Sequence, residues 1–215
     1  MKNWNKIALI IFCLITFFVN NASLPTDIME QRNIVTAREM VSEGNWLVPT
    51  MNGELRLEKP PLPTWVAGGI EKVIPDSLAA QRTAAGIMGC VWTMFLFLTA
   101  RYMSKRDDFA MATVVVFLTC YNLILMGRSA TWDIYCHAFM MAGIYYFTRA
   151  IYEDHHYRQW FVIAGIFMGL SFLSKGPVSF YTLLLPYLIM LIAFPHPSMR
   201  GKWFSLSLMI ILTLV

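Results

Sequence analysis

Most of the carboxylates of this chain gather in one segment, from about Asn20 to Asp76, which lies between two apolar stretches. The segment carries both carboxylates and cations: Asp27, Glu30, Arg32, Arg38, Glu39, Glu58 and Lys59. A carboxylate can accept a proton from a reacting group. A lysine or arginine can stabilise negative charge as it develops. This combination predicts a site for an anionic group.

Lys59 stands in a stiff run, Glu58-Lys59-Pro60-Pro61. Each proline fixes its own backbone φ, and a proline also pushes the residue before it into an extended conformation. A lysine side chain held on such a segment suits a phosphate. The alternative is a proline-rich entry to the next helix, in which Glu58 and Lys59 are simply solvated.

Glu30 falls within an expected helix, which Thr26 or Asp27 can cap and which runs to about Glu43. Apolar side chains recur along it at helical spacing: Ile34, Ala37 and Val41. Glu30 shares this face, where a carboxylate is costly without a partner, and Arg38 could be that partner. The alternative is a surface helix with Glu30 favoured near its N-terminus by the helix dipole.

Further charged residues fall where later apolar stretches end. Arg82 lies just inside the second stretch, where it could extend its charged group to the surface. Arg128 and Asp133 lie between the third and fourth stretches, and an acid there can favour a helix N-terminus. Lys175 lies between the fifth and sixth and could be an interfacial anchor. Taken together, these connections offer charge to one face, which favours a binding site.

The composition is that of a membrane protein. Apolar residues make up 57% of the chain, against about 45–50% in soluble domains, and the mean hydropathy is +0.54. Stretches approaching the roughly 20 residues of a spanning helix predict an all-α, polytopic helical membrane protein: 7–19, 77–99, 109–126, 134–152, 160–173, 178–194 and 203–215. Residues 20–76 then form its first outer loop. Because the last stretch stops in mid-span, we expect the N-terminal part of a longer protein.

The lysine and arginine distribution predicts the orientation. With the N-terminus inside, the inner side would hold nine of the 17 cations but only four of the 13 acids. The loop 20–76 then faces outward, and a short helix from about Pro63 to Val73 would lie along the interface with Trp65 at headgroup level. The first stretch could instead be a cleaved signal peptide, but its exit, Asn20-Asn21-Ala22-Ser23, is a poor cleavage site.

Several kinds of site are disfavoured. The four cysteines all fall in apolar stretches without metal-type spacing, which indicates core residues rather than disulfides or ligands. His155 and His156 are adjacent and would point apart on a helix, so a shared metal is not expected. No basic tract interleaved with aromatics indicates nucleic acid. The net charge of +4 fits contact with anionic membrane lipid.

An ordered set of motifs runs through the first loop: Glu30-Gln31-Arg32, Ala37-Arg38-Glu39-Met40, Gly44-Asn45-Trp46-Leu47-Val48-Pro49, Asn52-Gly53, Glu58-Lys59-Pro60-Pro61-Leu62 and Trp65. Further residues follow in order: Arg82, Arg128, Asp133 and Lys175-Gly176-Pro177. The set, from about Asp27 to Pro177, resembles that of lipid-linked-sugar glycosyltransferases of the GT-C fold. The aminoarabinose transferases of bacteria and the protein O-mannosyltransferases are the most similar types.

This resemblance implies an inverting transfer of a sugar from a polyprenyl-phosphate donor to a lipid A-like glycolipid or a protein. It also implies a multi-pass protein of the bacterial inner membrane, with interfacial helices in the first outer loop and an outward-facing active site. The donor phosphate would be bound by cations: Lys59, helped by Arg82, Arg128 or Lys175. Glu30 or Asp133 would accept the proton of an acceptor hydroxyl, whereas an acceptor phosphate would need no base.

The resemblance has two further consequences. Glu58 could contact a divalent metal, with a histidine partner beyond Val215. The family usually shows Asp-Glu where this chain has Met29-Glu30, so the role of that aspartate could pass to Glu30 or to Asp27.

Two other function classes remain open. A transporter or flippase of a lipid-linked solute would need ionisable residues near the middle of the membrane. The centres of the apolar stretches contain few such residues, which argues against this class. A scaffold with a charged outer rim would tolerate alanine at Lys59.

Overall fold

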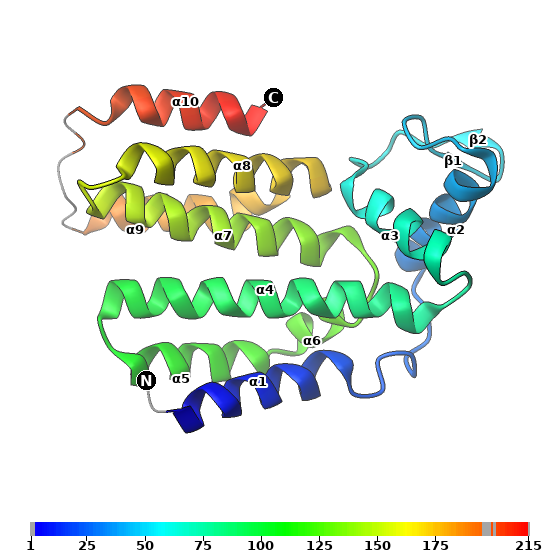
Figure 1. The fold of residues 1–215 in the computed structure, drawn as a ribbon, viewed down its shortest axis with the longest axis horizontal. Coiled ribbons are helices and arrows are strands. Elements are labelled where there is room, and N and C mark those ends of the chain that lie inside the picture. The colour runs from blue at the N-terminus through cyan, green and yellow to red at the C-terminus, as the bar shows by residue number, and fades with distance from the viewer. Residues whose placement is uncertain (1–2, 195–198, 200, 215) are drawn as a thin grey trace.

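The computed structural model describes residues 3–194, 199 and 201–214. This part of the chain forms a bundle of helices that run side by side, with a small unit packed on one end of the bundle (Figure 1). The small unit comes from the segment that the sequence predicted as the first outer loop. We refer to the end that carries it as the loop end, and to the other as the far end.

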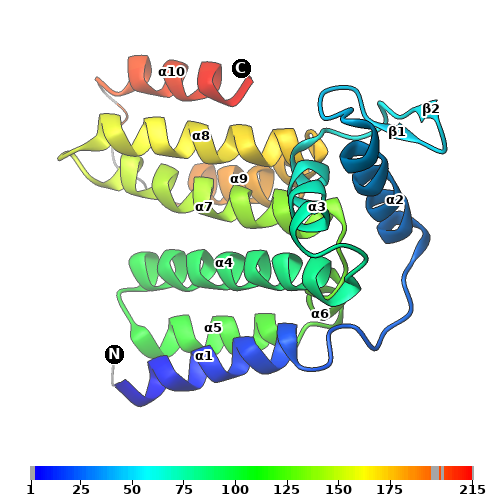
Figure 2. The ribbon, with the colours of Figure 1, turned by 45° about the vertical axis from the view of Figure 1, so that its right-hand side comes forward.

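The bundle helices cover the predicted apolar stretches. Their bounds are α1 Asn3–Phe18, α4 Leu78–Ser104, α5 Asp107–Leu118, α6 Tyr121–Gly127, α7 Trp132–Tyr152, α8 Tyr157–Lys175, the π-helix η1 Phe180–Leu184, α9 Leu185–Ala193 and α10 Trp203–Leu214. In Figure 2, α4 lies in the middle, with α1 and α5 on one side and α7, α8 and α10 on the other. The predicted all-α fold class is confirmed.

Among the described residues, α4 is the one helix that is long and apolar enough to cross a bilayer by itself. The helices α5 and α6 would make a second such element if the bent pair counts as one span. Shorter apolar helices are Ile7–Phe18, Phe180–Ala193 and Trp203–Leu214. Crossing of the membrane by each predicted stretch stays a prediction.

The third apolar stretch, 109–126, differs from the expected continuous element. It is broken between α5 and α6, whose axes differ by 73°. Beside the break, the Thr119 hydroxyl donates to the carbonyls of Val115 at 3.1 Å and Val116 at 2.9 Å. Such bonding of threonine back to its own helix bends helices. The short helix α6 then leads the chain to the loop end.

The small unit consists of two helices and a hairpin. Helix α2 (Ile28–Glu43) begins at Asp27, whose carboxylate accepts a hydrogen bond from the Glu30 N–H at 2.7 Å. It ends at Gly44, at φ +77°, where glycine carries no Cβ strain. Helix α3 spans Leu62–Val73. The two helices predicted in this segment are therefore present, and their placement at a membrane interface stays a prediction.

Strands β1 (Thr50–Met51) and β2 (Glu54–Leu55) form an antiparallel hairpin. Its turn residues, Asn52 and Gly53, have φ of 56° and 76°, as the commonest two-residue hairpin turn requires. Glu39 of α2 ties the hairpin down, because its carboxylate accepts from the Thr50 hydroxyl at 2.8 Å and from the Asn52 N–H.

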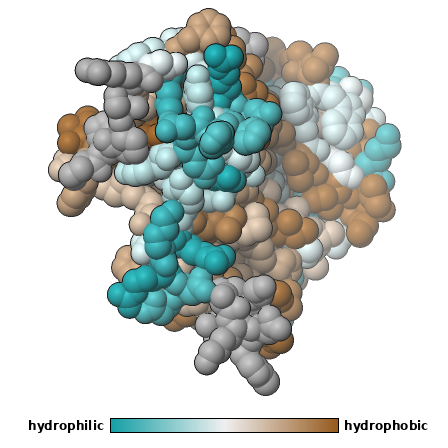
Figure 3. All heavy atoms as spheres, turned by 60° about the vertical axis from the view of Figure 1, so that its left-hand side comes forward, coloured by the Kyte–Doolittle hydropathy of each residue, from teal (hydrophilic) through white to brown (hydrophobic). Residues whose placement is uncertain are grey.

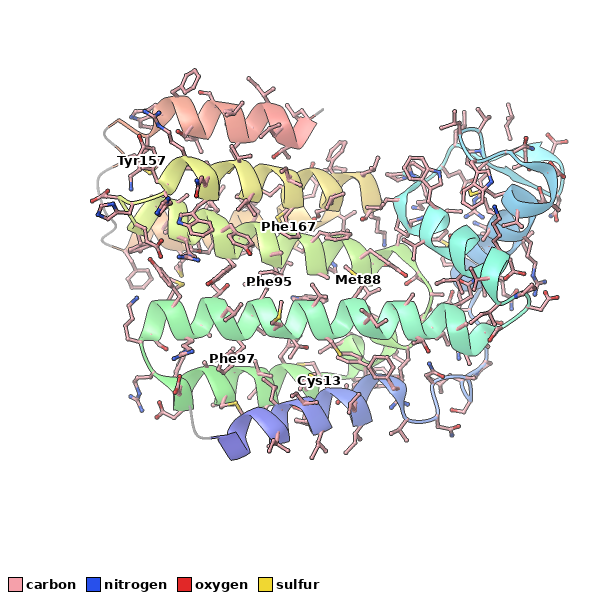
Figure 4. The ribbon with its side chains drawn as sticks, viewed as in Figure 1. Cys13, Met88, Phe95, Phe97, Tyr157 and Phe167 are labelled. Carbon is pink, nitrogen blue, oxygen red and sulfur yellow. The ribbon has the colours of Figure 1, made fainter. Side chains whose placement is uncertain are left out.

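Close packing fixes the bundle around small residues. Phe17 of α1 is fully buried, and a Cβ added to Gly89 of α4 would lie 2.8 Å from its ring. A Cβ on Gly127 of α6 would come closer still. On the other side of α4, Phe95 points towards Phe167 of α8, with ring centroids 5.9 Å apart (Figure 4).

Candidate functional site

The connector Arg128–Thr131 between α6 and α7 holds the small unit against the bundle. The Ser129 hydroxyl donates to Asp27 at 3.4 Å, and the Ala130 N–H donates to Glu30 at 2.8 Å. The Ala130 carbonyl accepts from the Asn33 side chain at 2.8 Å. This short turn segment thus brings α2 and the first turn of α7 together.

Glu30 and Arg82 form a buried ion pair in this region. The Arg82 Nε lies 2.8 Å from Glu30 Oε1, and its Nη2 lies 2.7 Å from Oε2. Each of these two side chains is 1% exposed. Their pairing satisfies the requirement that a buried charge be compensated. The partner of Glu30 is therefore Arg82, and the expectation that Arg38 could fill this role is wrong.

Arg82 uses its remaining donors within the protein. Its Nη1 donates to the carbonyls of Asn21 at 2.9 Å and Leu24 at 2.8 Å, which lie in the chain leaving α1. Glu30 Oε1 also accepts the Ala130 N–H described above. Both side chains are paired and almost completely buried. This geometry joins α2, α4 and the connector, and the predicted roles of Glu30 in catalysis and of Arg82 in phosphate binding stay predictions.

Arg38 takes a different place. It pairs with Asp76 at 2.6 Å and lies 3.5 Å from Glu71, and its side chain is half exposed. These three residues line a groove of about 330 Å³ between α2 and the turn from α3 to α4. Arg38 therefore pairs with carboxylates of the α3–α4 region rather than with Glu30.

Asp133 and Lys175 meet at the loop end as an ion pair. Asp133 lies in the first turn of α7, and Lys175 is the last residue of α8. Their side chains are 28% and 22% exposed, so solvent reaches both. In contrast to the buried pair, this one offers a carboxylate and an ammonium that a ligand can approach.

Arg128 points away from that pair. Its Nε donates to the Thr16 carbonyl at 2.7 Å and its Nη2 to the Ile15 carbonyl at 3.0 Å. These carbonyls belong to the last turn of α1, where a cation is favoured by the helix dipole. The structure thus gives Arg128 the place of a C-terminal cap for α1.

Lys59 is half-buried on the segment that leads into α3, and α3 packs against α8. Among the described residues its ammonium has neither a hydrogen-bond nor an ion-pair partner. Glu58 beside it is exposed. Asp27 is exposed as well, although one of its oxygens caps α2. Lys59 is therefore a cation with unused donors at the loop end.

Glu58 is not part of a cluster of three or more metal-binding side chains within the described residues. Within residues 3–194, 199 and 201–214, no group of three or more histidine, cysteine, aspartate or glutamate side chains lies close enough to hold an ion. The described residues therefore do not fit a divalent metal by themselves.

Arg56 is a buried cation that the sequence reasoning missed. It is 6% exposed, and its Nη1 donates to the Arg32 carbonyl at 2.6 Å and the Thr36 hydroxyl at 2.9 Å. Its guanidinium lies 5.4 Å from the centre of the Trp132 ring. Burial lowers the pKa of Arg56 from its ordinary value, and the neighbouring Glu58 carboxylate acts in the opposite direction.

Two buried donors are left over at this point, Arg56 Nη2 and Trp132 Nε1, for which the described residues supply no acceptor. Trp132 directly precedes Asp133 in the first turn of α7. Nothing in the local sequence marks Arg56, because its partners are backbone and hydroxyl groups brought in by α2.

Comparison with known proteins shows which family the sequence matches. The model of the dolichyl-phosphate-mannose-protein mannosyltransferase family matches residues 58–215. An undecaprenyl phosphate-alpha-4-amino-4-deoxy-L-arabinose arabinosyl transferase of Shewanella sediminis is 27% identical over 164 residues, which cover 74% of this chain and 29% of that protein. A transferase of the same description from Proteus mirabilis is 26% identical, over 85% of this chain and 33% of its own length. The chain thus spans about a third of these curated relatives.

Solved structures agree in fold. The crystal structure of ArnT from Cupriavidus metallidurans bound to undecaprenyl phosphate superposes with a TM-score of 0.81 at 20% identity. The match covers 100% of this chain and 41% of that one. The same protein in the apo state gives a TM-score of 0.75 at 21% identity. The expected GT-C fold is confirmed.

Proposed function

The chain belongs to the dolichyl-phosphate-mannose-protein mannosyltransferase family, and on that basis we propose that it forms part of a membrane glycosyltransferase with a polyprenyl-phosphate sugar donor. The observation that carries the proposal is the loop end itself. There, a half-buried lysine that has no partner among the described residues lies at the same end of the bundle as a solvent-accessible Asp133–Lys175 pair. The relatives named above support the choice of donor.

Lys59 is the first candidate to bind the donor phosphate. The prolines that follow it limit the conformations of its segment, so little entropy is lost when the ammonium meets an anion. As the bond between the sugar's anomeric carbon and the phosphate oxygen breaks, its electron pair stays on the phosphate. A fixed positive charge beside that oxygen stabilises the developing negative charge. Lys175, at the end of α8, is the second candidate.

Asp133 is the carboxylate best suited to the acceptor. The new bond forms between the anomeric carbon and an acceptor oxygen, and a hydroxyl acceptor must give up its proton. Asp133 is accessible to solvent and can take that proton. Its contact with Lys175 would have to open or be shared when the acceptor binds. If the acceptor is a phosphate, Asp133 positions it through Lys175 and no base is required.

The other predicted residues take supporting roles in this proposal. Glu30 and Arg82 fasten α2 to the bundle, Arg128 fastens α1, and Asp27 starts α2. Met29 stands where the family usually has an aspartate. Neither neighbouring acid is wholly free to replace it, because one Asp27 oxygen caps α2 and Glu30 is held by Arg82 and the Ala130 N–H. Asp27 keeps a second, exposed oxygen, so it remains a candidate for contact with substrate.

The proposed location is the bacterial inner membrane, crossed several times, with the loop end on the outer side. The positive-inside distribution of lysine and arginine supports this orientation. The acceptor would be a glycolipid or a protein on that side. Glu58 would join a metal site only with ligands from outside the described residues.

The test measures transfer of labelled sugar from polyprenyl phosphate by the full-length protein in detergent. We expect Lys59→Ala to lower kcat by about 10²–10³ and Asp133→Asn by about 10²–10⁴ with a hydroxyl acceptor. Lys72→Ala is the matched control, since Lys72 is an exposed lysine in the last turn of α3. Wild-type rates in both of the first two variants would refute the assignment.

A further inference from the structure

A second candidate site lies at the far end, remote from Lys59 and Asp133. The turn from α4 to α5 borders a hollow of about 450 Å³, within the range of roughly 300–1,000 Å³ usual for ligand pockets. It is lined by Leu98, Arg101, Tyr102, Lys105, Asp107 and Tyr145. Figure 3 looks at this end, where hydrophilic side chains gather in the middle and hydrophobic ones flank them.

Two cations face this hollow from the end of α4. Arg101 and Lys105 are four residues apart, so they share one face of the helix end. Arg101 lies 2.8 Å from Asp107 and keeps half of its side chain exposed. The Lys105 ammonium has no carboxylate within ion-pair distance among the described residues. The lining therefore holds two cations against one carboxylate, an excess of positive charge.

Tyrosine rings form the wall. The Lys105 ammonium lies 4.0 Å from the centre of the Tyr102 ring, over its face. Tyr102 in turn meets the edge of Tyr152, with ring centroids 6.4 Å apart. A second hollow of about 240 Å³ opens on the other side of this residue, lined by Tyr102, Met103, Lys105 and Tyr152. Lys105 thus lines both hollows, and its ammonium packs on the Tyr102 ring.

Two neighbouring cations at the same end have carboxylate partners. Arg106 pairs with Asp108. Arg149 binds Glu153 through two nitrogens, at 2.9 and 3.1 Å. Lys105 differs from these two in having no carboxylate partner among the described residues, and Arg101 keeps half of its side chain exposed.

The side chains around Arg101 and Lys105 favour a lipid headgroup over a dissolved ion as the ligand. Met103 is 41% exposed, Phe109 is 55% exposed and Tyr152 is 38% exposed. Apolar and aromatic side chains of this kind, beside a helix end with lysine and arginine, are typical of the membrane–water interface. An anion held by Arg101 and Lys105 would have its apolar part next to these side chains.

We propose that the cleft between α4, α5 and α7 at the far end binds the phosphate of an anionic phospholipid. Arg101 and Lys105 contact the phosphate, and Tyr102 and Tyr145 line the glycerol. The acyl chains lie along the exposed apolar flank of Met103 and Phe109. This site is independent of sugar transfer and lies at the opposite end of the helices from it.

The experiment is native mass spectrometry of the full-length protein, released from nanodiscs made of equal parts phosphatidylglycerol and phosphatidylethanolamine. We expect the wild type to retain phosphatidylglycerol preferentially. Lys105→Asn removes the charge at a residue whose φ is +56°, which asparagine tolerates. Lys105→Asn and Arg101→Gln should each lower this retention about fivefold. Lys105→Arg should keep it, and so should the control Arg106→Ala.

Three results would overturn the proposal. The first is equal retention of the two lipids by the wild type. The second is a loss in Arg106→Ala as large as that in Lys105→Asn, which would indicate unspecific surface attraction. The third is displacement of the bound lipid by millimolar glycerol phosphate, which would identify a free phosphate site. Arg101→Gln keeps the test decisive if Lys105→Asn unfolds, because it leaves the αL position of Lys105 intact.

Discussion

The buried pair of Glu30 and Arg82 gives a prediction that separates a structural from a catalytic role. Replacing Arg82 by methionine keeps an apolar stem of similar length but leaves the Glu30 carboxylate, 1% exposed, without its counter-charge. The change also removes the bonds to the Asn21 and Leu24 carbonyls, at 2.9 and 2.8 Å. Breaking a buried ion pair on one side costs about 3–5 kcal/mol. Glu30→Gln should fall in the same range, because it leaves the Arg82 guanidinium unpaired.

The assay compares stability with activity in the full-length protein. Denaturant unfolding, together with hydrogen exchange over α2 and the connector, should show a loss of about 3–5 kcal/mol for each single variant. The double variant Glu30→Leu with Arg82→Met should lose less than the sum of the two, since neither charge is then stranded. Arg32→Ala is the control, because Arg32 is exposed on the same helix. A Glu30→Gln protein that is as stable as the wild type yet inactive in sugar transfer would refute this reasoning and make Glu30 the base.

Two further predictions concern the frame around the site. Gly127→Ala should clash with the ring of the buried Phe17 and destabilise the packing of α1 by about 1–3 kcal/mol, seen as a lower melting temperature than that of Gly69→Ala, where a Cβ meets open space. Partial burial opposes ionisation of Glu39, but hydrogen bonds from Thr50 and the turn amides outweigh it, so the pKa of Glu39 is lowered. Its contribution is therefore fully present above the unfolded pKa of about 4.3 and is lost as the pH falls through the lower folded value. In the wild type, proteolysis of the hairpin turn should become faster as the pH falls through that window. In Glu39→Gln, the rate of cleavage should be the same above and below it.

Much of the fold was predictable because it depends on local patterns. Hydrophobic stretches mark where helices lie, and Asp27, Gly44 and Asn52-Gly53 mark a helix start, a helix end and a hairpin turn by well-known local chemistry. The break at Thr119 was missed because the apolar pattern continues through it. The bend depends on how α6 must pack against Phe17 and α4, which no window of sequence contains.

Site residues were harder to assign, since the sequence shows which residues are charged but not which residue forms an ion pair with each of them. Glu30 was correctly expected to need a partner. Arg38 was the partner expected from its place on the same helix, and only the path of the chain from α1 to α4 shows that Arg82 takes that place. Arg56 carries no local signal, because its burial depends on α2 and Trp132. Asp133 and Lys175, 42 residues apart, were both named from their place at the ends of apolar stretches, and the structure brings them together.

The most direct test of the account is the affinity of the full-length protein for polyprenyl phosphate, measured by titration with the wild type, Lys59→Ala and Lys72→Ala. The account predicts that Lys59→Ala weakens binding by about tenfold or more, the effect of losing roughly one charged hydrogen bond, while Lys72→Ala binds as the wild type does. Equal affinity in all three proteins would contradict the claim that the loop end holds the donor phosphate.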